Sequence, residues 1–162
     1  MANTLAIFKK GEDAPAFSGD DKSAAITGLA PNTAVAAGDY QGAFTDGTNY
    51  SDKVDVPAFT VKDVVLAAPA IAATAGDASV AFTITAGKAN GGSTATAYKV
   101  SYSADGTTWS DYAATEATAL TGTIGSLTNG TEYQLKAVAV NAAGNSAESA
   151  IAKVTPVAAT AG

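Results

Sequence analysis

The chain has 162 residues, 47% of them hydrophobic, and a formal net charge of −6. Because nucleic acids and anionic membranes attract basic surfaces, this charge argues against both as partners. Cysteine and histidine are absent, so disulfides are excluded and the usual thiolate nucleophile and imidazole base are missing. The length allows one ordinary domain or two small ones.

Short apolar segments separated by turns predict strands in the first 62 residues. The first strand is expected at 4–10 and the second at 40–45, followed by an Asp46-Gly47 turn. A last strand is expected within 50–61, where Pro57 favours an edge position because proline has no N–H to donate to a neighbouring strand.

Two distant segments share a spacing of apolar residues. In each, an apolar residue lies three positions before a leucine and another lies six positions after it. The positions are Ile26, Leu29 and Val35 in the first segment, and Ile124, Leu127 and Tyr133 in the second. This pattern predicts a weak internal repeat with a short first copy of about 60 residues. Chance similarity between two threonine-rich segments stays open as the alternative.

The second half predicts an antiparallel β-sandwich. Val80, Phe82 and Ile84 alternate with small or polar residues, as in a strand with one buried face. Seven short strands with turn residues every 8–12 positions are typical of a sandwich. The strands are expected at 70–72, 80–84, 98–102, 109–112, 118–124, 133–139 and 150–154.

The segment from Leu127 to Tyr133 predicts a tyrosine corner. The Asn129-Gly130 turn lies between these two residues and lets the chain fold back. The hydroxyl of Tyr133 is then expected to bond to the backbone just upstream while its ring is buried.

Residues 69–157 resemble a fibronectin type III domain. The resemblance implies a seven-stranded Greek-key sandwich. Ile84 stands about where the family commonly has a tryptophan, which implies a smaller core. The resemblance rests on Val80–Ile84, Tyr98–Tyr102, Asp105–Trp109, Leu127–Tyr133 and Ala139–Gly144.

The first module is similar to immunoglobulin-like modules of tailed-phage structural proteins. The segments that carry this resemblance are Ala25–Leu29, Gly38–Gln41 and Asp55–Thr60. With too few strands for a complete sandwich, its apolar faces are expected to need a partner. The residues expected to form an oligomerisation or attachment surface are Leu5, Ile7, Phe8, Ile26, Leu29 and Phe44.

The expected organisation is all-β with two domains. A β-rich attachment module spans 1–62 and the sandwich spans 69–157. Between them, the segment 63–68 is expected to be a linker that packs at the junction, and 158–162 a flexible tail.

No residue pattern indicates catalysis, a cofactor or a metal, so we expect a chain that is not an enzyme. The acidic pairs Asp20-Asp21 and Asp52/Asp55 lack the spacing of a glycosidase or a calcium loop. The glycine-rich segment 87–93 precedes a strand, whereas a phosphate-binding loop precedes a helix. Trp109 and Tyr112 are candidates for a glycan platform, with cross-strand packing as the alternative.

The expected function is a structural accessory protein of a tailed-phage virion, and specifically a capsid decoration protein. The chain would be assembled in the bacterial cytoplasm, since 1–13 has no secretory signal and no segment is long enough to span a membrane. The first module would self-associate and bind the major capsid or tail protein, and the second would contact host carbohydrate weakly. The alternatives are a tail-tube or tail-tip accessory, and a carbohydrate-binding module of a secreted polysaccharide-degrading system.

Overall fold

The computed structural model describes residues 3–159, and this part of the chain contains strands and no helix. The all-β prediction is confirmed. The chain divides into two compact units, Met1–Lys62 and Asp63–Gly162, called unit 1 and unit 2 below. Of the tail predicted at 158–162, residues 160–162 lie outside the described residues.

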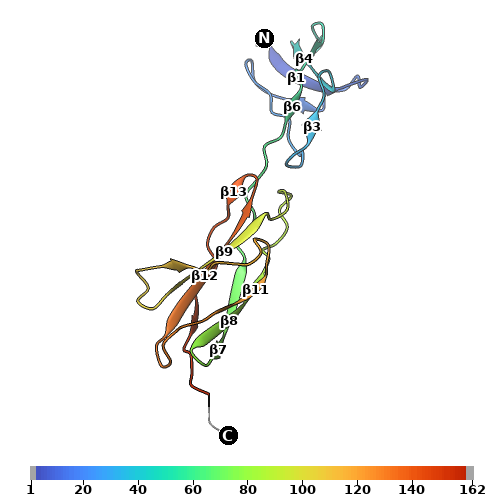
Figure 1. The fold of residues 1–162 in the computed structure, drawn as a ribbon. Coiled ribbons are helices and arrows are strands. Elements are labelled where there is room, and N and C mark those ends of the chain that lie inside the picture. The colour runs from blue at the N-terminus through green and yellow to red at the C-terminus, as the bar shows by residue number, and fades with distance from the viewer. Residues whose placement is uncertain (1–2, 160–162) are drawn as a thin grey trace. The chain divides into compact units, whose positions relative to one another are not determined.

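Unit 1 is built on a four-stranded antiparallel sheet (Figure 1). Its order is β2-β1-β4-β5, and β1 and β4 form the long central pair. A second, two-stranded sheet pairs β3 with β6. The bounds are β1 Thr4–Lys9, β2 Phe17–Ser18, β3 Ala34–Val35, β4 Tyr40–Thr45, β5 Val54–Asp55 and β6 Phe59–Thr60. The strand predicted at 50–61 is thus two strands, and Pro57 lies between them.

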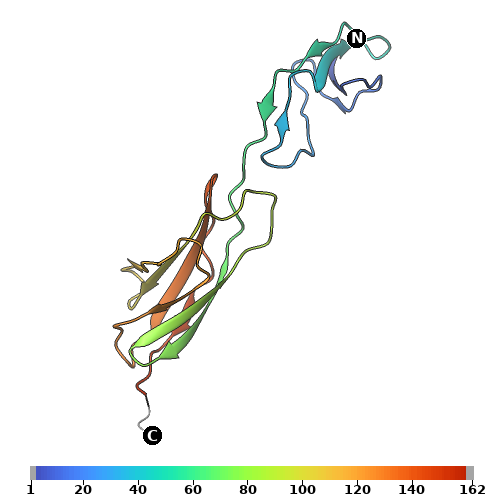
Figure 2. The same ribbon diagram turned by 45° about the vertical axis from the view of Figure 1, so that its right-hand side comes forward.

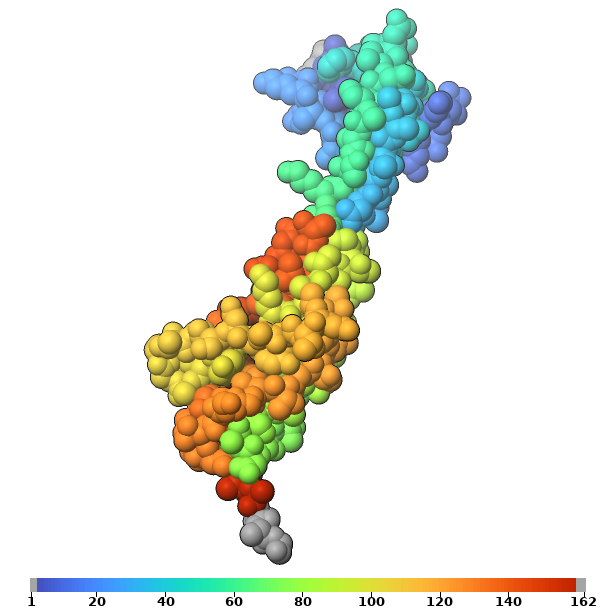
Figure 3. All heavy atoms as spheres, in the orientation of Figure 1, coloured from blue at the N-terminus to red at the C-terminus, as the bar shows by residue number. Residues whose placement is uncertain are grey.

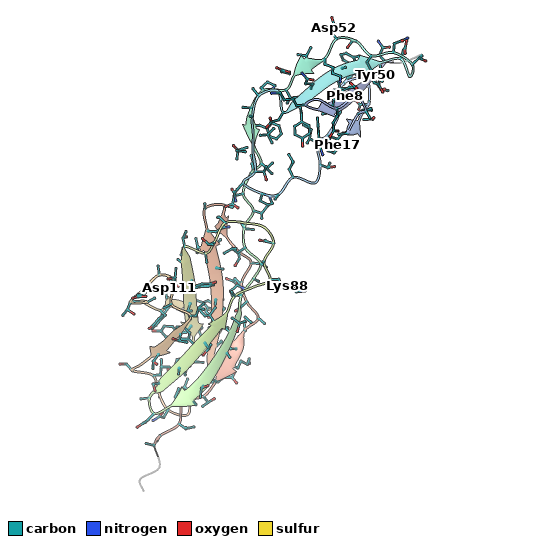
Figure 4. The ribbon with its side chains drawn as sticks, turned by 90° about the vertical axis from the view of Figure 1, so that its right-hand side faces the viewer. Phe8, Phe17, Tyr50, Asp52, Lys88 and Asp111 are labelled. Carbon is teal, nitrogen blue, oxygen red and sulfur yellow. The ribbon has the colours of Figure 1, made fainter. Side chains whose placement is uncertain are left out.

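Phe8 is the centre of unit 1 and is fully buried. On its face of the sheet it packs with Ala6 and Ala43. The ring of Tyr50 meets it edge-on at 5.1 Å, and Figure 4 shows the two rings together. The ammonium group of Lys53 lies 4.1 Å from the centre of the Phe8 ring and donates a hydrogen bond to the carbonyl oxygen of Glu12. The 50–53 segment therefore closes this face over Phe8.

Ile7 lies on the opposite face of the same strand, because successive side chains of a strand point to opposite sides. It is 5% exposed and packs with Val35 and Tyr40. The prediction that Phe8 belongs to an attachment surface is wrong, because the 50–53 segment covers its face of β1 and the ring is fully buried. On the other face, Ile7 is packed in the core of unit 1 on one side.

Unit 2 is a two-sheet sandwich in which every strand pairing is antiparallel. One sheet has the order β11-β8-β7, and the other is β10-β9-β12 with β13 and β14 on the far side of β12 (Figure 2). The sandwich prediction is confirmed, with β13 and β14 as two parts of one broken edge strand. The bounds are β7 Ala70–Gly76, β8 Ser79–Thr85, β9 Ala97–Ser103, β10 Ser110–Asp111, β11 Thr121–Ile124, β12 Tyr133–Asn141, β13 Gly144–Asn145 and β14 Ala152–Val154.

The strand orders of the two units differ. The first strand of unit 1, β1, lies between two neighbours, whereas the first strand of unit 2, β7, is an edge strand. The similar spacing around Leu29 and Leu127 therefore does not reflect a shared topology.

The core of unit 2 lies between its sheets and follows the predicted alternation. Val80, Phe82 and Ile84 of β8 are at most 4% exposed, and Leu135 and Ala137 of β12 are fully buried. Ile84 occupies the core at the position where the resemblance would place a tryptophan.

Tyr133 closes one end of unit 2. Its hydroxyl accepts a hydrogen bond from the backbone N–H of Thr128 at 3.2 Å, and Leu127 packs against the core. Gly130 between them has a φ of 81°, which favours glycine at this turn. The polar end of a buried ring thereby has a partner in the chain just upstream.

The segment predicted as a linker is bonded to unit 2. The Asn141 amide donates to the carbonyl oxygen of Val64 at 2.8 Å, and the Asn90 amide donates to that of Val65 at 2.7 Å. The carboxylate of Asp63 accepts from both the N–H and the hydroxyl of Ser93. The 63–65 part of the segment is therefore fixed to the loop between β8 and β9 and to the end of β12.

The turn between β9 and β10 is held by Asp105, in the segment that stands out from unit 2 in Figure 3. Its carboxylate accepts hydrogen bonds from the N–H groups of Thr108 at 2.7 Å and Thr107 at 2.8 Å, and from the hydroxyl of Ser103 at 3.0 Å. These bonds favour the charged form and hold the pKa of Asp105 well below its ordinary value.

Replacing Asp105 by asparagine is expected to destabilise unit 2 at pH 7 but to have less effect in acid. A carboxyl whose folded pKa is lowered stabilises the fold above its unfolded pKa of about 3.9, and this stabilisation is lost as pH falls. Guanidinium unfolding of both proteins at pH 7 and pH 2.5, followed by Trp109 fluorescence, measures how much their free energies of unfolding differ at each pH. If this difference were the same at both pH values, the role given to the charge of Asp105 would be contradicted.

Candidate functional site

One apolar face of the unit 1 sheet is covered over only part of its length. The strand register places Leu5 opposite Phe44, and both Ile7 and Val54 opposite Gly42, so these five residues share a face. Towards Tyr40 this face is covered by other apolar residues of unit 1. They are Phe17, Ala24, Ile26, Leu29, Val35, Val56 and Phe59.

Towards Phe44 the same face is open. Phe44 is 46% exposed and Val54 is 69% exposed. Between them lies a hollow of about 300 Å³, called the groove below. Apolar side chains form most of its walls. Its lining residues are Leu5, Ile7, Gly42, Ala43, Phe44, Ser51, Asp52, Val54, Asp55, Val56 and Pro57.

Gly42 forms the floor of the groove. A Cβ atom at this position would lie 3.7 Å from the Cδ1 atoms of Leu5 and Ile7, an ordinary van der Waals distance. Its φ is outside the left-handed region, so the backbone does not require glycine here. The groove exists because a central strand lacks a side chain where its neighbours are apolar.

The charged side chain at the groove is that of Asp52, which lies at the surface of the unit (Figure 4). Asp55 also contributes to the lining, but it lies opposite Gln41 in the register, so its carboxylate points to the other face of the sheet, where it accepts a hydrogen bond from the Gln41 amide at 2.7 Å. The ammonium group of Lys53 is engaged over Phe8 and with Glu12. The rim of the groove is therefore negative beside an apolar floor.

The predicted attachment residues fall into three groups. Leu5, Phe44 and the largely buried Ile7 line the groove, Ile26 and Leu29 are half-buried against the core, and Phe8 is a core residue. The sequence reasoning missed Gly42 and Val54. The sequence around these two residues gives little indication of a site. They share a surface with Leu5 and Phe44 only because of the register in which the strands pair.

Trp109 and Tyr112 do not form a common platform, so this part of the glycan prediction is wrong. Tyr112 packs into the core of unit 2, with its ring edge-on to Phe82 at 5.0 Å. Trp109 lies under the ammonium group of Lys136, at 4.2 Å, and Lys136 alternates with the buried residues of β12. The two rings thus belong to opposite faces of the sheet, and Lys136 and its ion pair with Glu148 lie over Trp109.

Among residues 3–159, no three acidic side chains gather closely enough to hold a metal ion. Within that same range, no helix is long and apolar enough to span a membrane. The prediction that the chain is not an enzyme stays a prediction.

The antiparallel sandwich and its tyrosine bond define unit 2 as an immunoglobulin-like β-sandwich module. Residues 69–155 match the fibronectin type III domain family, and the chain belongs to this family. No curated protein sequence matches the chain.

Solved structures of modular proteins resemble the chain in fold. Domains A168–A170 of titin align with a TM-score of 0.54 at 19% identity, over 96% of this chain and 55% of that one. The FN1–FN3 domains of chicken CNTN1 align with a TM-score of 0.54 at 15% identity, over 97% and 57%. A beta-1,2-glucanase from Parabacteroides distasonis aligns with a TM-score of 0.50 at 21% identity, over 75% and 18%.

The chain thus spans little more than half of the titin and CNTN1 structures and a smaller share of the glucanase. At these identities the similarity shows the fold alone. The predicted resemblance of unit 1 to tailed-phage modules stays a prediction.

Proposed function

We propose that the chain is a non-catalytic structural accessory protein that attaches to a larger assembly through unit 1 and displays unit 2. The observation that carries this proposal is the groove. It leaves Phe44 and Val54 exposed on a sheet face whose other half is packed as core. Contiguous apolar surface of this kind marks interaction sites in soluble proteins.

The assembly that we favour is the capsid of a tailed phage, with the major capsid protein as the partner of unit 1. The resemblance of the 25–60 segment to immunoglobulin-like phage modules supports this choice. A stable fold without cysteine also suits assembly in a reducing bacterial cytoplasm. Attachment to a tail tube or tail tip is the alternative within the same proposal.

Particles purified from the bacterial culture that produces the chain test the proposal. We expect mass spectrometry to find the chain in the particle fraction at many copies, and immunogold labelling to place it on heads. Val54→Asp is expected to release the chain from the particles. Ile151→Asp, at a similarly exposed position of unit 2, is expected to leave the chain attached. Absence of the chain from every particle fraction would contradict the proposal.

A further inference from the structure

Resting on the proposed function, we propose that the groove binds an apolar side chain flanked by lysine or arginine on the surface of a different protein. The apolar side chain would lie over Gly42, between Phe44 and Val54. The basic residues would face Asp52 at the rim.

Gly42 leaves room on the sheet for a side chain from another molecule. Glycine within a strand weakens it, and it often marks a place where another molecule approaches closely. Here the backbone conformation gives no reason for glycine, and an added methyl group would meet Leu5 and Ile7 at ordinary distances. The strand therefore has room for a side chain that it does not supply. At about 300 Å³ the hollow is at the small end of ligand pockets, which suits one side chain rather than a whole cofactor.

Charge argues against a symmetric contact with a second copy of this chain. The charged side chain at the groove is that of Asp52, because Asp55 is bonded to Gln41 on the other face of the sheet and Lys53 is turned to Phe8 and Glu12. A symmetric contact between two grooves would bring the two Asp52 carboxylates together, and like charges across an interface oppose binding. A basic surface instead complements the rim.

Peptide titrations of the whole chain, labelled with ¹⁵N and followed by NMR, test this inference. The probe is the blocked peptide Ac-Lys-Lys-Leu-Lys-Lys-NH2, with Ac-Glu-Glu-Leu-Glu-Glu-NH2 and Ac-Lys-Lys-Gly-Lys-Lys-NH2 as matched controls. We expect the basic leucine peptide to bind with a Kd of about 1 mM, because only one leucine side chain enters the groove. Its binding should shift the amide signals of Gly42, Phe44 and Val54. Each control is expected to bind at least about tenfold more weakly.

Variants separate the groove from general charge attraction. Gly42→Ala keeps the fold and is expected to weaken the leucine peptide by about tenfold by raising the floor, and Gly42→Val is expected to abolish binding. Asp52→Asn is expected to weaken it about threefold, whereas Glu116→Gln, an exposed acid of unit 2, leaves it unchanged.

Three results would overturn the inference. They are equal binding of the acidic peptide, unchanged binding by Gly42→Ala, and a dimer in sedimentation that Gly42→Ala dissolves, which would make a second copy the occupant. The proposed function fails separately. A chain that stays on particles without binding the peptide refutes this inference alone, and a chain that binds the peptide but is absent from particles refutes the attachment proposal alone.

Discussion

Replacing Phe8 by alanine is expected to unfold unit 1 and leave unit 2 folded. The ring is fully buried, and removing such a ring from a core costs about 3–5 kcal/mol. A unit of about 60 residues buries little surface and is only marginally stable, so this cost is comparable to its whole free energy of unfolding. In ¹⁵N NMR spectra, the amide signals of residues 3–62 should collapse to unfolded positions. The single tryptophan, Trp109, lies in unit 2, so its fluorescence transition in guanidinium should not move.

Phe44→Ala is the matched control. It removes the same ring from the same sheet, but Phe44 is 46% exposed, so we expect a cost of about 1 kcal/mol or less. If Phe44→Ala unfolded unit 1 and Phe8→Ala did not, the assignment of Phe8 to the core and Phe44 to the surface would be reversed.

The sequence identified the strand of Phe8 but not its environment. Alternation shows that Ile7 and Phe8 point to opposite faces, and a strand next to a solvated face would expose one of them. Here both are buried, because Tyr50 and Lys53 cover one face and Val35 the other. These covering residues are distant in sequence and follow no local period, so only the tertiary structure reveals them.

Unit 2 was easier to predict, because its signals are local. The alternation on β8 and the turn before Tyr133 each lie within a short window. The edge strand β7 was predicted too short, at 70–72 instead of Ala70–Gly76, since alanine, threonine and glycine give little contrast between faces. Pairing with β8 along its length sets its real extent.

The groove was the least predictable feature. A glycine in a strand is an ordinary sign of a bulge or a bend, and nothing local distinguishes Gly42 from such a case. Its meaning comes from the register, which sets Ile7 and Val54 on either side of it. The predicted platform of Trp109 and Tyr112 was wrong for a related reason. Regular alternation does not hold along this irregular edge, so a separation of three residues does not show on which face of the sheet each ring lies.

Replacing both Ser146 and Ser149 by alanine is expected to produce the largest loss of stability among polar changes in unit 2. Each serine bonds β12 twice, where the edge strand is broken between β13 and β14. The N–H of Ser149 donates to the carbonyl oxygen of Ala137 at 2.8 Å, and its hydroxyl accepts from the Ala137 N–H at 3.0 Å. Ser146 does the same with Ala139, at 2.8 and 3.0 Å.

The hydroxyls thus stand in for the carbonyl groups of a regular strand. Each hydroxyl also donates to the backbone oxygen of the next residue, Ser146 to Ala147 at 2.7 Å and Ser149 to Ala150 at 2.8 Å. Each hydroxyl therefore both accepts and donates a hydrogen bond. Both serines are 8% exposed, and Ala137 and Ala139 are buried. Without the hydroxyls, two buried N–H groups lose their acceptors, at about 1–3 kcal/mol each. Guanidinium unfolding followed by Trp109 fluorescence should show a loss of about 2–6 kcal/mol.

Ser101→Ala provides the comparison, because the Ser101 hydroxyl donates to an exposed carboxylate, that of Asp111, at 2.7 Å. Water can replace that bond, so we expect a change within about 0.5 kcal/mol. A double variant no less stable than Ser101→Ala would mean that water reaches the freed N–H groups of β12. The edge from 144 to 154 would then be held by the short pairings of β13 and β14 alone, and the serines would be incidental to the way this sandwich closes.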